Sequence, residues 1–231
     1  MLTKFSEIKY TRPDMKAAEQ SVYDFISGLE KAKSYEEARK LLIEYDKATD
    51  GVSAMYTVAS IRNTADTRDE FYDGEMNFFY EEFPKFQLVA KKANEALLAS
   101  PFKPDFEREF GADMLKNFEA EIRLADESIV NDRVEESKLT QEYAKLTAGC
   151  TVEFNGEDCN FYGLLKYMQS TDRAVRKAAF EAWADLYKSV SDKLDAIYIR
   201  LCNIRRGMAQ KLGFKSYIEM AYLANGHYYY G

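Results

Sequence analysis

The residue types that most often carry out catalysis are scarce in this sequence of 231 residues. It contains a single histidine, His227, in the closing run Asn225-Gly226-His227-Tyr228-Tyr229. A zinc hydrolase usually needs two imidazole ligands, and a serine or cysteine triad needs an imidazole beside its nucleophile. We therefore predict no catalytic residue and no metal ligand within these 231 residues.

Two carboxylates lie beside a turn signal in the second half of the chain. Asn155-Gly156 favours a type I′ turn because both residues accept a positive φ angle, which predicts a short β-hairpin near residues 150–161. In the register of that turn Glu153 faces Asp158. The two carboxylates could form a metal or acid-base pair, but such pairs on the exposed face of a hairpin are usually solvated, and we interpret them as structural.

The three cysteines are the other candidates for metal or redox chemistry. Cys150, Cys159 and Cys202 form neither an even disulfide framework nor a common metal-binding spacing. The expected hairpin register pairs Val152 with Cys159, so that Cys150 lies diagonal to Cys159 and a disulfide between them would be strained. We expect reduced thiols that are mostly packed among other side chains.

The rest of the sequence has the apolar periodicity of α-helices. A first helix is predicted to begin at Pro13, because proline suits the first helical position. Ser34 and Glu37 form a capping box that starts a second helix, whose apolar stripe continues in phase past Gly51. The side chains of this second helix expected to face inward are Ala38, Leu41, Leu42, Tyr45, Val52, Met55 and Tyr56.

Prolines divide the next part of the sequence. Pro84 is expected to end one helix and to separate an aromatic stretch, 71–83, from an amphipathic stretch, 86–98, because proline lacks the amide proton that a helix needs. Pro101 and Pro104 are expected to mark a loop. Shorter helices should follow around residues 114–124 and 130–146.

The longest periodic stretch runs from Val175 to Leu212, with apolar residues recurring every three or four positions. It predicts either one helix of roughly 60 Å or two helices with a break near residues 189–192. Gly213 is expected to end it. A helix of this length is typical of a domain's spine or of one wall of a cleft.

Composition excludes several classes of partner. The formal net charge is −7, and Lys and Arg are scattered among Asp and Glu, so we expect no binding to nucleic acid or to an anionic membrane. No apolar run approaches the roughly 20 residues that span a bilayer, and residues 1–7 lack the apolar core of a signal peptide. The expected location is the cytoplasm.

Five stretches together resemble a known family. Residues 168–177 (MQSTDRAVRK) and 206–217 (RGMAQKLGFKSY) are similar to segments of the oligoendopeptidase F branch of the thimet-oligopeptidase-like zinc metallopeptidases. Residues 5–14, 59–67 and 138–146 resemble earlier parts of the same branch, in the same order. No single motif is unique, but the order of several makes the resemblance specific, and it extends over essentially the whole chain.

The resemblance implies a mainly α fold, a helical bundle that forms the wall of a channel-type peptidase, with one short β-hairpin near residues 150–161. It divides the chain into an N-terminal helical region (1–149), a hairpin and connection (150–167), and the start of the peptidase-type helical domain (168–231). The family cleaves short unstructured peptides inside a deep channel. It binds zinc through an HExxH helix and a more distant glutamate.

No position in this sequence matches that zinc site, because His227 is followed by Tyr228 and no second histidine exists. By resemblance the chain corresponds to about the first two fifths of a family member and is truncated relative to it. We therefore expect the N-terminal part of a zinc metallo-oligoendopeptidase that supplies scaffold and channel wall, holds no cofactor itself and is inactive alone. Its expected partners are short peptides and the C-terminal catalytic portion, which in a split enzyme would be a second chain.

The alternative is a non-catalytic helical module that binds a peptide or a partner helix. Aromatic residues make up 14% of the chain and gather at Phe71-Tyr72, Phe78-Phe79-Tyr80 and Tyr228-Tyr229-Tyr230, and such rings suit peptide recognition. Aromatic residues at helical spacing are more often part of a core, however, and we interpret the first two clusters in that way.

His227 has three interpretations: an exposed residue at a frayed end, a buried polar side chain, or a residue that lines the channel of the complete enzyme. The resemblance makes His227, Tyr228 and Tyr229 candidate substrate-channel residues. Arg205 and Arg206, near the end of the long helix, could contact acidic groups of a peptide or could compensate the helix dipole.

Overall fold

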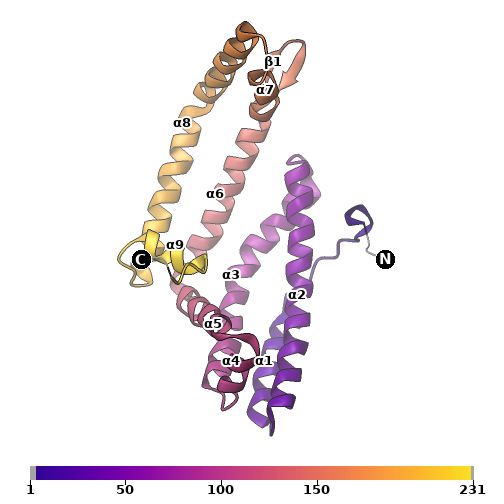
Figure 1. Cartoon of the computed structure of the whole chain (residues 1–231), viewed down its shortest axis with the longest axis vertical. Helices are drawn as coiled ribbons and strands as arrows, with labels where there is room; N and C mark the ends of the chain where they lie inside the picture. Colours follow the sequence, from indigo (N-terminus) through magenta and orange to yellow (C-terminus); the bar gives the residue numbers. More distant parts are fainter. Residues whose placement is uncertain (1–3, 230–231) are drawn as a thin grey trace. The chain divides into compact units, whose positions relative to one another are not determined.

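The computed structural model describes residues 4–229 and is mainly α-helical with one β-hairpin, as the sequence predicts (Figure 1). Two short 3₁₀ turns, Phe5–Glu7 and Glu127–Ile129, accompany these elements. The helices and strands are α1 (Met15–Lys31), α2 (Tyr35–Ala65), α3 (Glu70–Ala99), α4 (Lys103–Phe110), α5 (Ala112–Leu124), α6 (Val130–Gly149), β1 (Val152–Phe154), β2 (Glu157–Cys159), α7 (Phe161–Met168), α8 (Arg173–Lys211) and α9 (Tyr217–Ala224).

The chain forms two compact units. Unit 1 comprises Met1–Val134 and Arg206–Gly231, and unit 2 comprises Glu135–Arg205. Unit 1 therefore contains α1 to α5, α9 and one end each of α6 and α8, while the hairpin and α7 belong to unit 2. No helix among residues 4–229 is both long enough and apolar enough to span a membrane.

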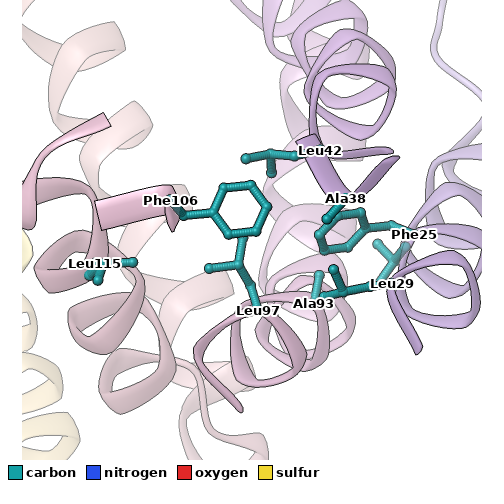
Figure 2. Packing of buried hydrophobic residues seen from close by; sticks show 9 residues of the cluster. Phe25, Leu29, Ala38, Leu42, Ala93, Leu97, Phe106 and Leu115 are labelled. Atoms are coloured by element: carbon teal, nitrogen blue, oxygen red, sulfur yellow. The ribbon is translucent and has the colours of Figure 1, made fainter. Parts of the chain in front are cut away.

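The main core of unit 1 is built by apolar side chains from α1 to α5. Figure 2 shows Phe106 of α4 beside Leu97 of α3, and Phe25 of α1 near Ala38 of α2. Tyr35 packs edge-on against Phe106, with the ring centroids 5.1 Å apart. The buried members of this core are Val22, Phe25, Leu29, Ala38, Leu42, Ala93, Leu97, Phe106 and Leu115.

The first two helices begin at capping residues. The backbone amides of Lys16 and Ala17 donate to the Asp14 carboxylate, so that α1 starts at Met15 and Pro13 precedes the helix instead of beginning it. The boundary differs from the expectation because the first amides of a helix lack a partner within the helix, and the aspartate side chain accepts hydrogen bonds from them.

The capping box at the start of α2 is present. The Glu37 amide donates to Ser34 Oγ at 3.3 Å, and the Glu37 carboxylate accepts from the Lys33 amide at 2.8 Å. As the sequence predicts, α2 continues through Gly51 without interruption.

The expectation that Pro84 separates two helices is wrong. Helix α3 continues through Pro84 from Glu70 to Ala99. A proline inside a helix removes one backbone hydrogen bond and crowds the preceding turn. Here its aromatic neighbours Phe83 and Phe86 both pack against the buried residues Met15, Ala18 and Val52, and this burial holds the helix together across the proline.

One further helix boundary differs from the expectation, and the length of another helix decides between two alternatives. Pro104 lies in the first turn of α4 and not in a loop, which suits a residue without an amide proton to donate. The long apolar stripe forms one continuous helix, α8, without a break at residues 189–192. Gly213, with φ of 74°, follows its end as predicted.

In unit 2 the hairpin has the predicted register. Val152 pairs with Cys159 and Glu153 with Asp158, across the turn Asn155-Gly156 with φ angles of 54° and 79°. Cys159, Phe161, Leu164, Leu186 and Val190 form the buried core of this unit, which joins β2, α7 and α8.

The glycines in two helices provide a stability prediction. A Cβ at Gly51 meets nothing within 4 Å, so Gly51→Ala is expected to raise the free energy of unfolding by about 0.5–1 kcal/mol through helix propensity alone. At Gly28 the added Cβ would lie 2.8 Å from Leu41 Cδ2, so Gly28→Ala must displace that side chain and gain less. Urea denaturation of both variants tests this; equal stabilisation would contradict the packing argument.

Candidate functional site

The three candidate channel residues follow helix α9 in unit 1. This helix begins at a second capping box, in which the Glu219 amide donates to Ser216 Oγ at 3.3 Å and the Lys215 amide donates to the Glu219 carboxylate at 3.1 Å. The helix ends at Ala224. The capping box therefore fixes the start of α9, the helix that the candidate residues follow.

The chain then turns back over α9. Gly226 has φ of 68°, a conformation that favours glycine, and the His227 amide donates to the Tyr222 carbonyl at 2.9 Å. The His227 side chain is exposed, and its ring lies edge-on to Tyr222, with the centroids 5.6 Å apart. Of the three interpretations of this histidine, the structure excludes the buried one.

Tyr228 and Tyr229 hold this turn against helix α5. The Tyr228 hydroxyl donates to Asn117 Oδ1 at 2.6 Å, and the Tyr229 hydroxyl donates to Asp113 Oδ1 at 2.5 Å. Lys116 Nζ donates to the Tyr229 hydroxyl and lies 4.2 Å from the centroid of its ring. We call residues 225–229, together with these contacts, the tyrosine clasp.

The clasp shifts the pKa values of its members. The hydrogen bond from Tyr229, followed by that from Lys116, lowers the pKa of Asp113. The hydrogen bond with Tyr229 also raises the pKa of Lys116. Partial burial, followed by the negative charge of Glu121, raises the pKa of Tyr228. Asp113 and Lys116 are therefore charged and the Tyr228 hydroxyl is protonated at neutral pH.

The chemistry of the clasp is that of a contact surface. It offers an imidazole, an aromatic face and hydroxyls, but no nucleophile lies beside a base. Tyr230, the last member of the predicted aromatic cluster, lies outside the described residues. Tyr229 is 70% exposed.

Zinc has no matching ligand set within the part of the chain that the structure describes. No three His, Cys, Asp or Glu side chains of residues 4–229 come together in a group that could hold a metal ion. The one imidazole, that of His227, packs against an aromatic ring. These residues do not fit the zinc site that the sequence resemblance implies for the complete enzyme.

The other sequence candidates are dispersed. Glu153 and Asp158 face solvent on the hairpin. Arg205 pairs through Nε with Glu136 Oε1 at 2.7 Å within unit 2, which accounts for its charge without a ligand. The cysteines are unpaired thiols, with Cys159 buried and Cys150 and Cys202 half-buried.

The early aromatic clusters serve mainly as packing. Phe79 is fully buried, and Phe78 and Tyr80 pack against the same small core as Tyr72, as interpreted from the sequence. Phe71 differs, because it is 58% exposed although its ring contacts Tyr10.

One polar cluster in unit 1 was missed by sequence reasoning. Glu75 of α3 is 4% exposed and accepts hydrogen bonds from the guanidinium of Arg12, at 2.5 to 3.2 Å, and from the hydroxyl of Tyr10. Nearby, Arg62 donates to the Ile8 carbonyl at 2.6 Å. The sequence feature that could have indicated this cluster is an acidic residue directly before Met76, which is buried. The hydrogen-bond partners of Glu75 lie 63 and 65 residues away from it in the sequence.

Comparison with a family model decides the family. The model of the peptidase M3 N-terminal domain matches residues 5–125, more than half of the chain. The chain belongs to the peptidase M3 family. This agrees with the resemblance to the oligoendopeptidase F branch.

Solved structures extend this M3 assignment over the whole chain. PZ peptidase A, solved with an inhibitor, is 35% identical with a TM-score of 0.93, and the match covers 99% of this chain and 41% of that one. A protein from Bacillus anthracis strain Ames assigned as oligoendopeptidase F is 29% identical with a TM-score of 0.93, covering 98% and 42%. Another structure assigned as oligoendopeptidase F is 32% identical with a TM-score of 0.94, covering 100% and 41%.

The chain described here, a member of the M3 family, thus spans about two fifths of the length of these solved chains. Among curated proteins no sequence matches it.

Proposed function

We propose that this chain is the N-terminal part of a zinc metallo-oligoendopeptidase that hydrolyses short unstructured peptides. The observation that carries the proposal is the match of nearly the whole chain to two fifths of PZ peptidase A at 35% identity. Since the matching family model is that of an N-terminal domain, the catalytic portion would follow the matched part. Zinc would be bound there, through the HExxH motif that this sequence lacks.

In this proposal the chain supplies scaffold and channel wall. The helices of unit 1 give a rigid base, since α1 to α5 share one buried core. His227, Tyr228 and Tyr229 would line the channel. The hydroxyls of both tyrosines are already bound to α5, so an extended peptide would meet the exposed ring of Tyr229 and the imidazole of His227. Aromatic faces of this kind contact peptide side chains without requiring a particular sequence.

The proposal predicts that the purified chain binds less than stoichiometric zinc and does not cleave a quenched fluorogenic peptide. Cleavage that a chelator abolishes is expected only after co-expression with a catalytic portion carrying HExxH. Zinc titration by calorimetry and the fluorogenic assay measure both properties. Stoichiometric zinc together with chelator-sensitive cleavage by the isolated chain would overturn the proposal.

A second candidate function is a stand-alone peptide-binding module. It is favoured by aromatic side chains that remain exposed, among them Phe71 at 58%, Tyr162 at 80% and Tyr229 at 70%. Calorimetric titration of the chain with unstructured peptides separates the two candidates. Binding without any catalytic partner would favour the module, while no binding together with concentration-dependent aggregation would favour the partial enzyme.

Two expectations from the sequence stay predictions. One is the division into residues 1–149, 150–167 and 168–231. The other is the cytoplasmic location.

A further inference from the structure

The dipeptide Asn-Gly occurs twice in the chain, as Asn155-Gly156 and as Asn225-Gly226. It favours a reaction that proteins undergo without an enzyme, the deamidation of asparagine. The reaction requires the backbone nitrogen of the second residue to reach the side-chain carbonyl carbon of the asparagine, and glycine has no side chain to hinder that approach. The two dipeptides share this chemistry, but the structure holds them differently.

Asn155-Gly156 forms the turn between β1 and β2 in unit 2. Both residues are exposed, with φ angles of 54° and 79°. Within residues 4–229, neither the Asn155 side chain nor the Gly156 amide has a hydrogen-bond partner. A short exposed loop can also open locally while the elements around it stay folded. The attacking nitrogen and the amide group that it must reach are therefore both accessible.

Asn225-Gly226, at the end of α9 in unit 1, is held by hydrogen bonds at both reacting groups. Asn225 Nδ2 donates to the Ala221 carbonyl at 2.7 Å, and this is the group that must leave. The Gly226 amide donates to the Leu223 carbonyl at 3.1 Å, and its nitrogen is the atom that must attack. The tyrosine clasp fixes the following residues to α5. Reaction here requires breaking these bonds first.

We propose that Asn155 is a site of spontaneous deamidation and isomerisation, and that Asn225 is protected from the same reaction by its hydrogen bonds. The Gly156 nitrogen loses its proton and bonds to Cγ of Asn155, while the bond from Cγ to Nδ2 breaks and ammonia leaves with that proton. Water then opens the resulting succinimide ring. Opening at Cγ gives aspartate, whereas opening at the main-chain carbonyl carbon gives isoaspartate, whose backbone is longer by a methylene group.

The hairpin cannot absorb a longer backbone without losing contacts. The residues on either side of the turn are both attached to α7, which lies next to the hairpin (Figure 1). The ring of Phe154 lies 5.0 Å from that of Tyr167, and Glu157 accepts a hydrogen bond from the Tyr167 hydroxyl at 3.0 Å. The length of the turn sets the register that pairs Val152 with Cys159. Isoaspartate at position 155 is therefore expected to loosen Cys159, which is 2% exposed in the core of unit 2.

Incubation of the purified chain at mildly alkaline pH, followed by peptide mapping with mass spectrometry, tests the proposal. Conversion at Asn155 is expected to be faster than at Asn225 by roughly tenfold or more, because reaction at Asn225 must first break two hydrogen bonds. The control is the chain unfolded in guanidinium chloride, in which both dipeptides should react at similar rates. An intact Asn155, or equal rates in the folded chain, would contradict the proposal, as would the same difference in denaturant.

The isolated isoaspartate form provides a second readout. Its Cys159 should react faster with a thiol reagent, and the unfolding transition of unit 2, followed by Trp183 fluorescence, should move to lower denaturant concentration. The matched variant is Asn155→Asp, which adds the charge of the other product to an acidic hairpin without lengthening the backbone, and it should have a smaller effect. An isoaspartate form with the Cys159 reactivity and stability of the unmodified chain would show that the turn does not control the core of unit 2.

Discussion

Replacing Phe106 by alanine is expected to lower the free energy of unfolding of unit 1 by about 3–5 kcal/mol. Phe106 is completely buried, between residues of α2 and α3, and it is the one buried residue of the short helix α4 (Figure 2). Truncation removes its transfer free energy and leaves a cavity. Helices α2 and α3 line that space and cannot close it without losing their own contacts.

Urea denaturation followed by far-UV circular dichroism measures this loss. The single tryptophan, Trp183, packs in unit 2, so its fluorescence reports the transition of that unit separately. Phe110→Ala is the matched control, because Phe110 lies on the same helix and is 42% exposed; it should cost less than about 1 kcal/mol. Similar losses for the two variants would show that α4 does not anchor the core.

Replacing Arg12 by alanine is expected to destabilise unit 1 by about 2–4 kcal/mol at neutral pH, more than replacing its partner in Glu75→Gln. The reason is a difference in burial. The Arg12 side chain is 54% exposed and water can solvate it when it loses its partner, whereas the Glu75 side chain is 5% exposed. Without Arg12 the Glu75 carboxylate would remain charged in a buried site, where the Tyr10 hydroxyl would still donate a hydrogen bond to it.

The pH dependence provides a second readout. Hydrogen bonds from Arg12 hold the pKa of Glu75 below its ordinary value of 4.5. A carboxyl whose folded pKa is lowered contributes stability above its unfolded pKa and loses it as the pH falls through the folded pKa. The difference between the unmodified chain and the Arg12→Ala variant should therefore be large at pH 7 and shrink below about pH 4.

Arg68→Ala is the control for this prediction. Arg68 is 89% exposed and pairs with Asp66 at 3.0 Å, so water screens the pair and its loss should leave stability nearly unchanged. A pH-independent effect of Arg12→Ala would contradict the charge argument and would indicate loss of packing against Phe78, whose ring centroid lies 4.7 Å from the guanidinium.

Features set by neighbours in the sequence were predictable. The Ser34 capping box and the hairpin register across Asn155-Gly156 depend on residues within three or four positions, and both occur as expected. Pro84 was misjudged because its effect on the helix depends on Phe83 and Phe86 reaching a core formed by α1 and α2. Local propensity cannot describe that contribution.

The candidate site was predictable only in part. Sequence resemblance selected His227, Tyr228 and Tyr229, and the structure places them together in one turn after α9. Their partners on α5 lie 111 to 116 positions earlier, so no local pattern could have indicated the clasp. Glu75 was missed for the same reason.

The Tyr10, Arg12 and Glu75 cluster also constrains the order of folding. Residues near the N-terminus are synthesised first, yet their hydrogen-bond partner in α3 is 63 to 65 residues away. During synthesis this segment has no carboxylate to bind until Glu75 has left the ribosome and α3 has begun to form. The segment that carries Tyr10 and Arg12 therefore cannot be fixed to Glu75 before α1, α2 and the start of α3 have been synthesised, and its attachment closes a loop that contains α1 and α2.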